Sequence, residues 1–153
     1  MTSPAIELTR SLEHVTPGRA LDLACGRGRH AIWLRDKGWQ VTAVDQVIAP
    51  MEGITCVQAD LEQEGFAIEP QAWDLIVVWL YWQSSLLPAI AKGIIPGGIV
   101  ALAGKMEGRF ATSLANYREA FQGWHELSTG EDHHKAHFIA RRTQPPQAAN
   151  PNS

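Results

Sequence analysis

A glycine turn is the first place where this sequence offers a ligand-binding arrangement. Gly26, Gly28 and Ala31 satisfy the loose pattern G-x-G-x-x-G/A between a predicted strand and a predicted helix. Glycine lets the backbone turn sharply and approach a ligand with no Cβ in between. The first helical turn then offers free N–H groups to a negative group. The pattern fits a nucleotide-binding turn, and it also fits a helix-capping turn without a ligand.

Three aspartates accompany this turn. Asp22 lies inside the strand before it, Asp45 ends the second strand, and Asp60 ends the third. A carboxylate at the end of the second strand can accept hydrogen bonds from both hydroxyls of a ribose, each contributing about 1.5–3 kcal/mol. The carboxyl ends of parallel strands line one crevice, so we expect the three aspartates near the same sheet edge. Because aspartate also starts turns readily, the alternative interpretation of Asp45 and Asp60 is a turn signal.

Short apolar runs between amphipathic or turn-rich segments predict the elements that position these residues. Strands are predicted over 19–25, 40–44, 54–59, 74–80 and 99–103, and helices over 30–37, 84–92 and 112–121. Two last strands, 124–128 and 136–141, leave no room for a helix between them and must pair as an antiparallel hairpin. The predicted fold is therefore α/β: a Rossmann-like doubly wound sheet of about seven strands, mostly parallel, with an antiparallel C-terminal hairpin strand and reduced helices.

The connections between strands are short. Eight residues separate Asp45 from Ile54, so a helix there must be one turn or absent. Gly65 and Pro70 oppose a long helix in the next connection. Thin helical cover predicts exposed apolar sheet and hence a homodimer, which a monomer in light scattering would contradict.

Composition limits the classes of protein. A chain of 153 residues, 45% hydrophobic and 19% charged, suits a single domain over 1–142, followed by a disordered tail over 143–153. The net charge of −3 argues against a nucleic-acid partner, and no apolar stretch is long enough to span a membrane. Cys25 and Cys56 are predicted to be buried, reduced thiols, and the N-terminus shows no export segment, so we expect a cytoplasmic protein.

The strand and turn at 21–28, Leu-Asp-Leu-Ala-Cys-Gly-Arg-Gly, resemble the first motif of class I S-adenosylmethionine-dependent methyltransferases. Asp22 inside the strand separates the motif from a dehydrogenase fingerprint. Residues 58–60 are similar to the family's adenine-binding step, 74–78 to its fourth strand and 95–98 to its turn before the fifth. The closing hairpin resembles the family's antiparallel seventh strand. The resemblance covers nearly the whole chain and is nearest to small bacterial methyltransferases of the tellurite-resistance type.

This resemblance implies S-adenosylmethionine as the cofactor. Residues 24–28 would hold its methionine part, Asp45 the ribose hydroxyls, and Asp60 with the Leu61 backbone the adenine. Arg29 or His30 would assist with the methionine carboxylate, unless both are solvent-facing residues of the first helical turn. The implied cofactor-binding residues are Asp22, Ala24, Cys25, Gly26, Gly28, Arg29, Asp45, Gln46, Asp60, Leu61 and Trp79.

Aromatic residues leave the fourth strand where the cofactor's sulfonium is expected. The faces of Trp79, Tyr81 and Trp82 can attract such a cation by about 0.5–2 kcal/mol. The alternative is core packing, which we expect for at least one of the three rings. Tyr81 is one candidate catalytic residue.

The hairpin loop at 130–135 should return to the same sheet edge and supplies two further candidates. His133 or His134 could act as a general base, because a histidine pKa lies near neutral pH. The alternatives are a solvated turn or a metal site with His137. No metal is predicted, because adjacent histidines on a hairpin point in different directions and no cysteine supports zinc.

Together these features predict an S-adenosylmethionine-dependent methyltransferase that acts on a small molecule by direct in-line methyl transfer. Much of the rate of such a displacement can come from positioning, so the catalytic residue stays unknown. One alternative is a non-catalytic cofactor-binding module or partner subunit. Another is an NAD-dependent enzyme, which only the loose glycine pattern favours. The residues do not reveal whether the acceptor atom is O, N, S or a metalloid.

Overall fold

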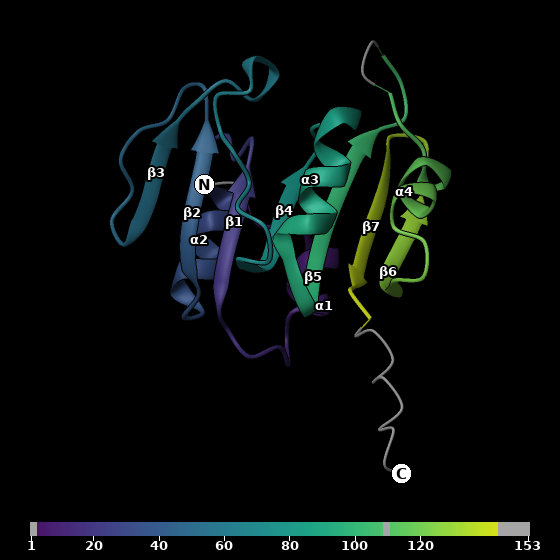
Figure 1. Ribbon diagram of the computed structural model, residues 1–153, viewed down its shortest axis with the longest axis horizontal. Coiled ribbons are helices and arrows are strands. Elements are labelled where there is room, and N and C mark those ends of the chain that lie inside the picture. The colour runs from purple at the N-terminus through teal and green to yellow at the C-terminus, as the bar shows by residue number, and fades with distance from the viewer. Residues whose placement is uncertain (1–2, 109–110, 144–153) are drawn as a thin grey trace, which may run out of the picture.

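A computed structural model describes residues 3–108 and 111–143 and contains one seven-stranded sheet in the order β3-β2-β1-β4-β5-β7-β6 (Figure 1). The strands are β1 (Arg19–Leu23), β2 (Gln40–Asp45), β3 (Ile54–Gln58), β4 (Trp73–Trp79), β5 (Ile94–Lys105), β6 (His125–Glu131) and β7 (Lys135–Arg141). The helices are α1 (Ile6–Ser11), α2 (Arg29–Asp36), α3 (Leu87–Gly93) and α4 (Leu114–Ala120), with short 3₁₀ helices η1 (Leu61–Gln63) and η2 (Ser84–Leu86).

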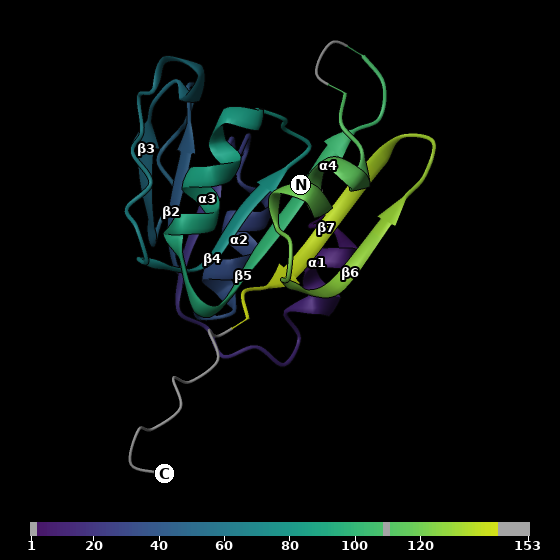
Figure 2. The same cartoon turned by 45° about the vertical axis from the view of Figure 1, so that its right-hand side comes forward.

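Strand directions confirm the predicted mixed sheet. Strands β1 to β5 pair in parallel, whereas β7 pairs antiparallel with both β5 and β6. Figure 2 shows β7 inserted between β5 and β6. Because β6 therefore runs parallel to β5, its carboxyl end reaches the same sheet edge as the ends of β1, β2 and β4.

The two faces of the sheet carry separate halves of the core. Helices α1 and α2 cover one face, where Leu8 and Leu34 are buried, and α3 and α4 cover the other, where Ile90 and Tyr117 are buried. Side chains of β4 alternate between the faces, and all of its residues except Asp74 are buried. The strand predicted over 74–80 is therefore a central strand that is covered on both sides.

Several boundaries differ from the prediction. Strand β1 ends at Leu23 because Ala24 has a φ of 52°, which a strand cannot contain. The helix predicted over 84–92 divides into η2 and α3. Strand β5 was predicted over 99–103 but begins at Ile94. The segment 95–98, expected as a turn before this strand, forms an irregularity within it: Trp73 pairs with Ile94, and Leu75 already pairs with Ile99.

Helix α1 was not predicted. It has six residues, and its N-cap, Ala5, provides no side-chain hydrogen bond, so the usual capping signal is missing from the sequence.

The thin cover elsewhere is confirmed: no helix lies between β2 and β3, and only η1 lies between β3 and β4. The homodimer stays a prediction. Most of the predicted tail, residues 144–153, lies outside the described residues. Among the residues that the structure describes, no helix has the length and apolarity needed to cross a membrane.

Candidate functional site

The glycine turn joins β1 to α2 through left-handed backbone conformations. Ala24, Gly26 and Gly28 have φ values of 52°, 58° and 86°. A Cβ on Gly28 would overlap Sδ of Met51, whereas a Cβ on Gly26 would meet nothing within 4 Å. Gly28 is therefore required by both backbone and packing. Gly26 is required by its backbone conformation alone and leaves open space beside the turn.

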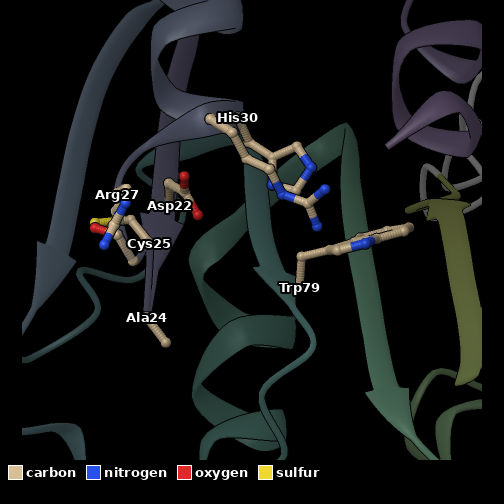
Figure 3. A pocket seen from close by; sticks show the side chains of 8 residues that line it. Asp22, Ala24, Cys25, Arg27, His30 and Trp79 are labelled. Atoms are coloured by element: carbon tan, nitrogen blue, oxygen red, sulfur yellow. The ribbon is translucent and has the colours of Figure 1, made fainter. Parts of the chain in front are cut away.

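A cavity of about 570 Å³ opens beside this turn (Figure 3). Its walls are Asp22 of β1, residues 24–27, Arg29 and His30 at the start of α2, and Trp79 at the end of β4. Figure 3 shows Asp22, His30 and Trp79 around it, each on a different element. The cavity thus joins residues that are far apart in the chain. Six of the predicted cofactor-binding residues line it: Asp22, Ala24, Cys25, Gly26, Arg29 and Trp79.

Asp22 is a buried carboxylate in this cavity, with a relative exposure of 2%. Among the described residues, its Oδ2 has no hydrogen-bond partner. Burial raises its pKa to about 7, against the opposing effects of the Ala31 backbone hydrogen bond and the charge of Arg29. Leaving a buried acceptor without a hydrogen bond costs free energy of folding. A ligand with a hydrogen-bond donor could supply the partner that this oxygen lacks.

Arg29 and His30 line the same cavity, which excludes the interpretation that both face solvent. Each is held by the backbone that precedes α1. Arg29 Nη1 donates to Ser3 O at 3.1 Å, and Ala5 N donates to His30 Nε2 at 3.1 Å. Burial, together with the charges of Arg29 and Lys135, lowers the pKa of His30 to about 4. The imidazole is therefore neutral at neutral pH.

A second cavity, of about 200 Å³, lies on the other side of Ala24, which lines both. Asp45, Gln46, Asp60, Leu61 and Tyr81 contribute to its walls. The structure thus brings the ends of β2 and β3 together beside the glycine turn, as the strand pattern predicts.

The two aspartates of the second cavity also organise the backbone. Asp45 Oδ2 accepts from Gly26 N at 2.9 Å, and its Oδ1 accepts from Val47 N at 3.2 Å. Asp60 Oδ1 caps η1 by accepting from Glu62 N at 3.0 Å. The turn-forming interpretation of both residues is therefore correct in part, and it coexists with their position in the cavity wall.

Tyr81 belongs to a chain of hydrogen bonds that sequence reasoning missed. Its hydroxyl donates to Gln83 Oε1 at 2.6 Å, and Gln83 Nε2 donates to Leu61 O at 3.1 Å. Burial and nearby carboxylates raise the pKa of Tyr81. The phenol therefore serves to hold the loop after β4 against η1, and it is poorly suited to act as a base at neutral pH.

Trp79 is buried between the first cavity and β7. The ring of His30 meets it edge-on at 5.7 Å between centroids, and Lys135 Nζ lies 5.4 Å from its ring centroid. Lys135 Nζ also pairs with Glu7 Oε1 of α1 at 2.8 Å. Sequence reasoning missed Lys135 and Glu7, whose ion pair joins β7 to α1. Trp82 packs against Tyr117 at the other core cluster, so at least one of the three aromatic rings serves in core packing, as expected.

His133 and His134 are exposed and line neither cavity. Asp132 Oδ1 accepts from the backbone N–H groups of His134 and Lys135, at 2.7 and 2.8 Å, which makes this segment a capped surface turn. Within residues 3–108 and 111–143, no three His, Cys, Asp or Glu side chains are grouped so that they could hold a metal ion.

The prediction that both cysteines are buried is wrong. Both are partly exposed, free thiols. Cys25 follows the end of β1 and lines the first cavity, because the backbone turns at Ala24 instead of continuing into the sheet. Burial of its sulfur and the nearby charges of Asp22 and Asp45 raise its pKa to about 12.

Residues 1–83 match a family model described as tellurite resistance protein TehB. Among solved structures, TehB from Haemophilus influenzae superposes with a TM-score of 0.78 at 17% identity, covering 94% of this chain and 64% of that chain. The chain therefore spans less than two thirds of that protein. A comparison with curated proteins gives no match.

Two further solved structures have the same fold. The 1,6-didemethyltoxoflavin-N1-methyltransferase of Burkholderia thailandensis, with bound 1,6-didemethyltoxoflavin and S-adenosylhomocysteine, has a TM-score of 0.70 at 18% identity, covering 90% of this chain and 77% of that chain. The N-methyltransferase NodS of Bradyrhizobium japonicum WM9, in complex with S-adenosylhomocysteine, has a TM-score of 0.69 at 17% identity, with coverages of 90% and 84%. The fold predicted from the sequence is thereby confirmed as that of S-adenosylmethionine-dependent methyltransferases.

Proposed function

Because the chain belongs to the TehB family of tellurite resistance proteins, we propose that it is an S-adenosylmethionine-dependent methyltransferase that acts on a small molecule. The observation that carries this proposal is the meeting of two cavities at Ala24. One contains an unpartnered carboxylate oxygen beside Arg29, and the other contains Asp45 and Asp60. This division matches a cofactor with an amino-acid end and a nucleoside end.

The residues of the first cavity fit the amino-acid end. Asp22 Oδ2 lacks a partner among the described residues, and an ammonium group would supply one. Arg29 supplies the positive charge that a carboxylate requires. Gly26 leaves open space beside its Cα, where any larger residue would put a side chain. The backbones of Ala24 and Cys25 complete the wall.

The residues of the second cavity fit the nucleoside end. Asp45 and Gln46 would take the ribose, and Asp60 would accept from the adenine amino group. Leu61 is the first residue of η1, so its N–H has no acceptor within that helix and is free for a ring nitrogen. Structures with bound S-adenosylhomocysteine among the similar folds support the same choice of cofactor.

When bound, the cofactor supplies a methyl group on a positively charged sulfur. The chain's contribution is to orient this group, to exclude water and to leave room for an acceptor. Trp79 forms part of the wall of the first cavity. The face of its aromatic ring can attract the positively charged sulfur. The described cavities present no side chain that is placed as an obvious general base, so positioning would supply most of the rate.

Calorimetric titration tests the cofactor. We expect S-adenosylhomocysteine to bind and NAD not to bind, and NAD binding without S-adenosylhomocysteine binding would refute the proposal. Transfer of labelled methyl from the cofactor to a panel of thiol, amine and oxyanion acceptors then tests the enzyme activity. Cofactor binding without transfer to any acceptor would favour the alternative of a non-catalytic module or partner subunit.

A further inference from the structure

We propose that His30 binds the cofactor by donating its Nδ1–H to the methionine carboxylate, and that the backbone N–H of Ala5 selects the tautomer able to do so. The inference rests on the proposed function and adds the segment before α1 to the binding site. That segment is not part of the glycine motif. It is distant from the motif in the sequence, and the fold places it next to His30.

The tautomer follows from one hydrogen bond. Ala5 N–H can only donate, so His30 Nε2, 3.1 Å away, must be the acceptor and carry no proton. A neutral imidazole has one proton, which is then on Nδ1. Ala5 is the N-cap of α1, and its N–H precedes the helix, so the bond does not compete with any helical hydrogen bond.

The remaining nitrogen is available to a ligand. His30 is 4% exposed and lines the first cavity. Within residues 3–108 and 111–143, Nδ1 has no hydrogen-bond acceptor, and it is not among the nitrogens that the protein seals from solvent. Figure 3 shows the ring of His30 reaching into the cavity from the start of α2. The Nδ1–H group is therefore directed by elimination toward the cavity.

The charges around the cavity select which end of an amino acid meets His30. Asp22 of β1 provides an acceptor on one side, and Arg29 of α2 provides positive charge beside His30. Lys135 of β7 is also near, but Glu7 of α1 pairs with it at 2.8 Å. An ammonium group therefore belongs with Asp22, and a carboxylate belongs with Arg29 and His30. The methionine part of the cofactor carries both groups on one carbon.

The same bond explains why His30 can remain a neutral donor. Protonation would place a hydrogen on Nε2, facing the hydrogen of Ala5 N, and would lose this bond. Burial and the charges of Arg29 and Lys135 disfavour the charged form in the same direction and lower the pKa to about 4. The donor is consequently unchanged across neutral and mildly acidic pH.

Substitution of His30 tests the contact. His30→Ala should weaken S-adenosylhomocysteine binding about tenfold or more, because a hydrogen bond to a charged group is lost. It should leave binding of methylthioadenosine unchanged, since this compound has the same nucleoside and sulfur but no amino acid. His30→Asn, whose amide nitrogen occupies the position of Nδ1, should retain most of the affinity for S-adenosylhomocysteine. Equal losses for both compounds, or no loss for either, would overturn the inference.

Substitution of Ala5 tests the tautomer without changing any group in the cavity. Ala5 has φ −63° and ψ 132°, a backbone conformation that proline adopts, so Ala5→Pro removes the N–H and directs the ring Cδ at His30 Nε2, which then has no donor on this side. Ile6→Pro is the matched control: it removes an N–H at the first position of α1, where proline is favoured and the N–H has no helical acceptor. Nitrogen NMR of the ring should show Nδ1–H in the wild type and in Ile6→Pro, and a mixture of tautomers in Ala5→Pro.

Ala5→Pro should also bind S-adenosylhomocysteine several-fold more weakly than Ile6→Pro. A wild-type ring protonated on Nε2, or equal affinities of the two proline variants, would overturn the inference. Failure of the wild type to bind S-adenosylhomocysteine would instead overturn the proposed function, and the ring spectra would still report the tautomer independently.

Discussion

Gly26 N–H donates a hydrogen bond of 2.9 Å to Asp45 Oδ2, which ties the glycine turn after β1 to the end of β2. The bond joins the walls of the two cavities, because Gly26 lines the first and Asp45 lines the second. The carboxylate that we propose for the ribose thus also holds the turn that we propose for the methionine part. A substitution at Asp45 should affect both ends of the ligand.

Asp45→Ala should weaken binding of S-adenosylhomocysteine by at least about 1 kcal/mol, which is roughly fivefold, because a charged acceptor for the ribose is removed. The loss of the Gly26 bond should also lower the free energy of unfolding. Calorimetry and chemical denaturation measure the two effects. Asp36→Ala, at an exposed position of α2, is the control and should change affinity little. An unchanged affinity in Asp45→Ala would mean that the ribose lies elsewhere.

Asp22→Asn should stabilise the ligand-free protein above about pH 7 and much less near pH 4, because burial raises the pKa of Asp22 to about 7. Between its unfolded pKa and this value, the native state binds more protons than the unfolded state. The wild type therefore loses stability as pH rises through this range, and asparagine removes the loss. Thermal unfolding across pH measures the difference, and a pH-independent difference would contradict it.

The same variant should bind S-adenosylhomocysteine more weakly, because an amide in place of Asp22 removes the negative charge offered to an ammonium group. Gain of stability together with loss of affinity is the signature of a residue retained for binding. Equal affinity of wild type and Asp22→Asn would indicate that the unpartnered oxygen faces no cationic group of the ligand.

Cys25 should react slowly with iodoacetamide at about pH 8, because its pKa is raised to about 12 and the thiolate is the reactive form. Peptide mass spectrometry gives the extent of modification at each cysteine. In denaturant Cys25 should react as an ordinary thiol, which controls for the reagent. Fast alkylation of native Cys25 would show that the environment of the turn does not protect its sulfur.

Gly28→Ala should destabilise the protein by about 1–3 kcal/mol through its left-handed backbone, with a further loss from the overlap with Met51 Sδ. Gly123→Ala is the matched control, since Gly123 has a φ of 83° but a Cβ there would meet nothing within 4 Å. Thermal unfolding should show the larger shift for Gly28→Ala. Similar shifts in both variants would remove the packing argument for Gly28.

Features encoded by neighbouring residues could be predicted from the sequence. The apolar run of β4, the glycine turn and the acids that end β2 and β3 each have a local pattern, and the sheet rules then place them at one edge. The structure agrees on all of these. It extends the prediction by showing two cavities that share Ala24.

Features that depend on distant partners could not be predicted in this way. Ala5 and His30 are 25 residues apart, and Gln83 and Leu61 are 22 apart, with no pattern that pairs them. The hairpin histidines show the converse: His133 and His134 have suitable chemistry, but Asp132 holds their turn at the surface. Their place beside the site is taken by Lys135, whose partner is on α1.

The insertion of β7 between β5 and β6 has a consequence for synthesis of the chain. Strand β6 leaves the ribosome before β7. Because β7 lies between β5 and β6 in the sheet, β6 has no strand to pair with until β7 has been made. Until residue 141 has emerged, the long and largely buried strand β5 is an open edge, available to other chains. A transcript that ends early within this hairpin would therefore produce a protein prone to aggregation, even though the glycine turn and both cavities were already encoded.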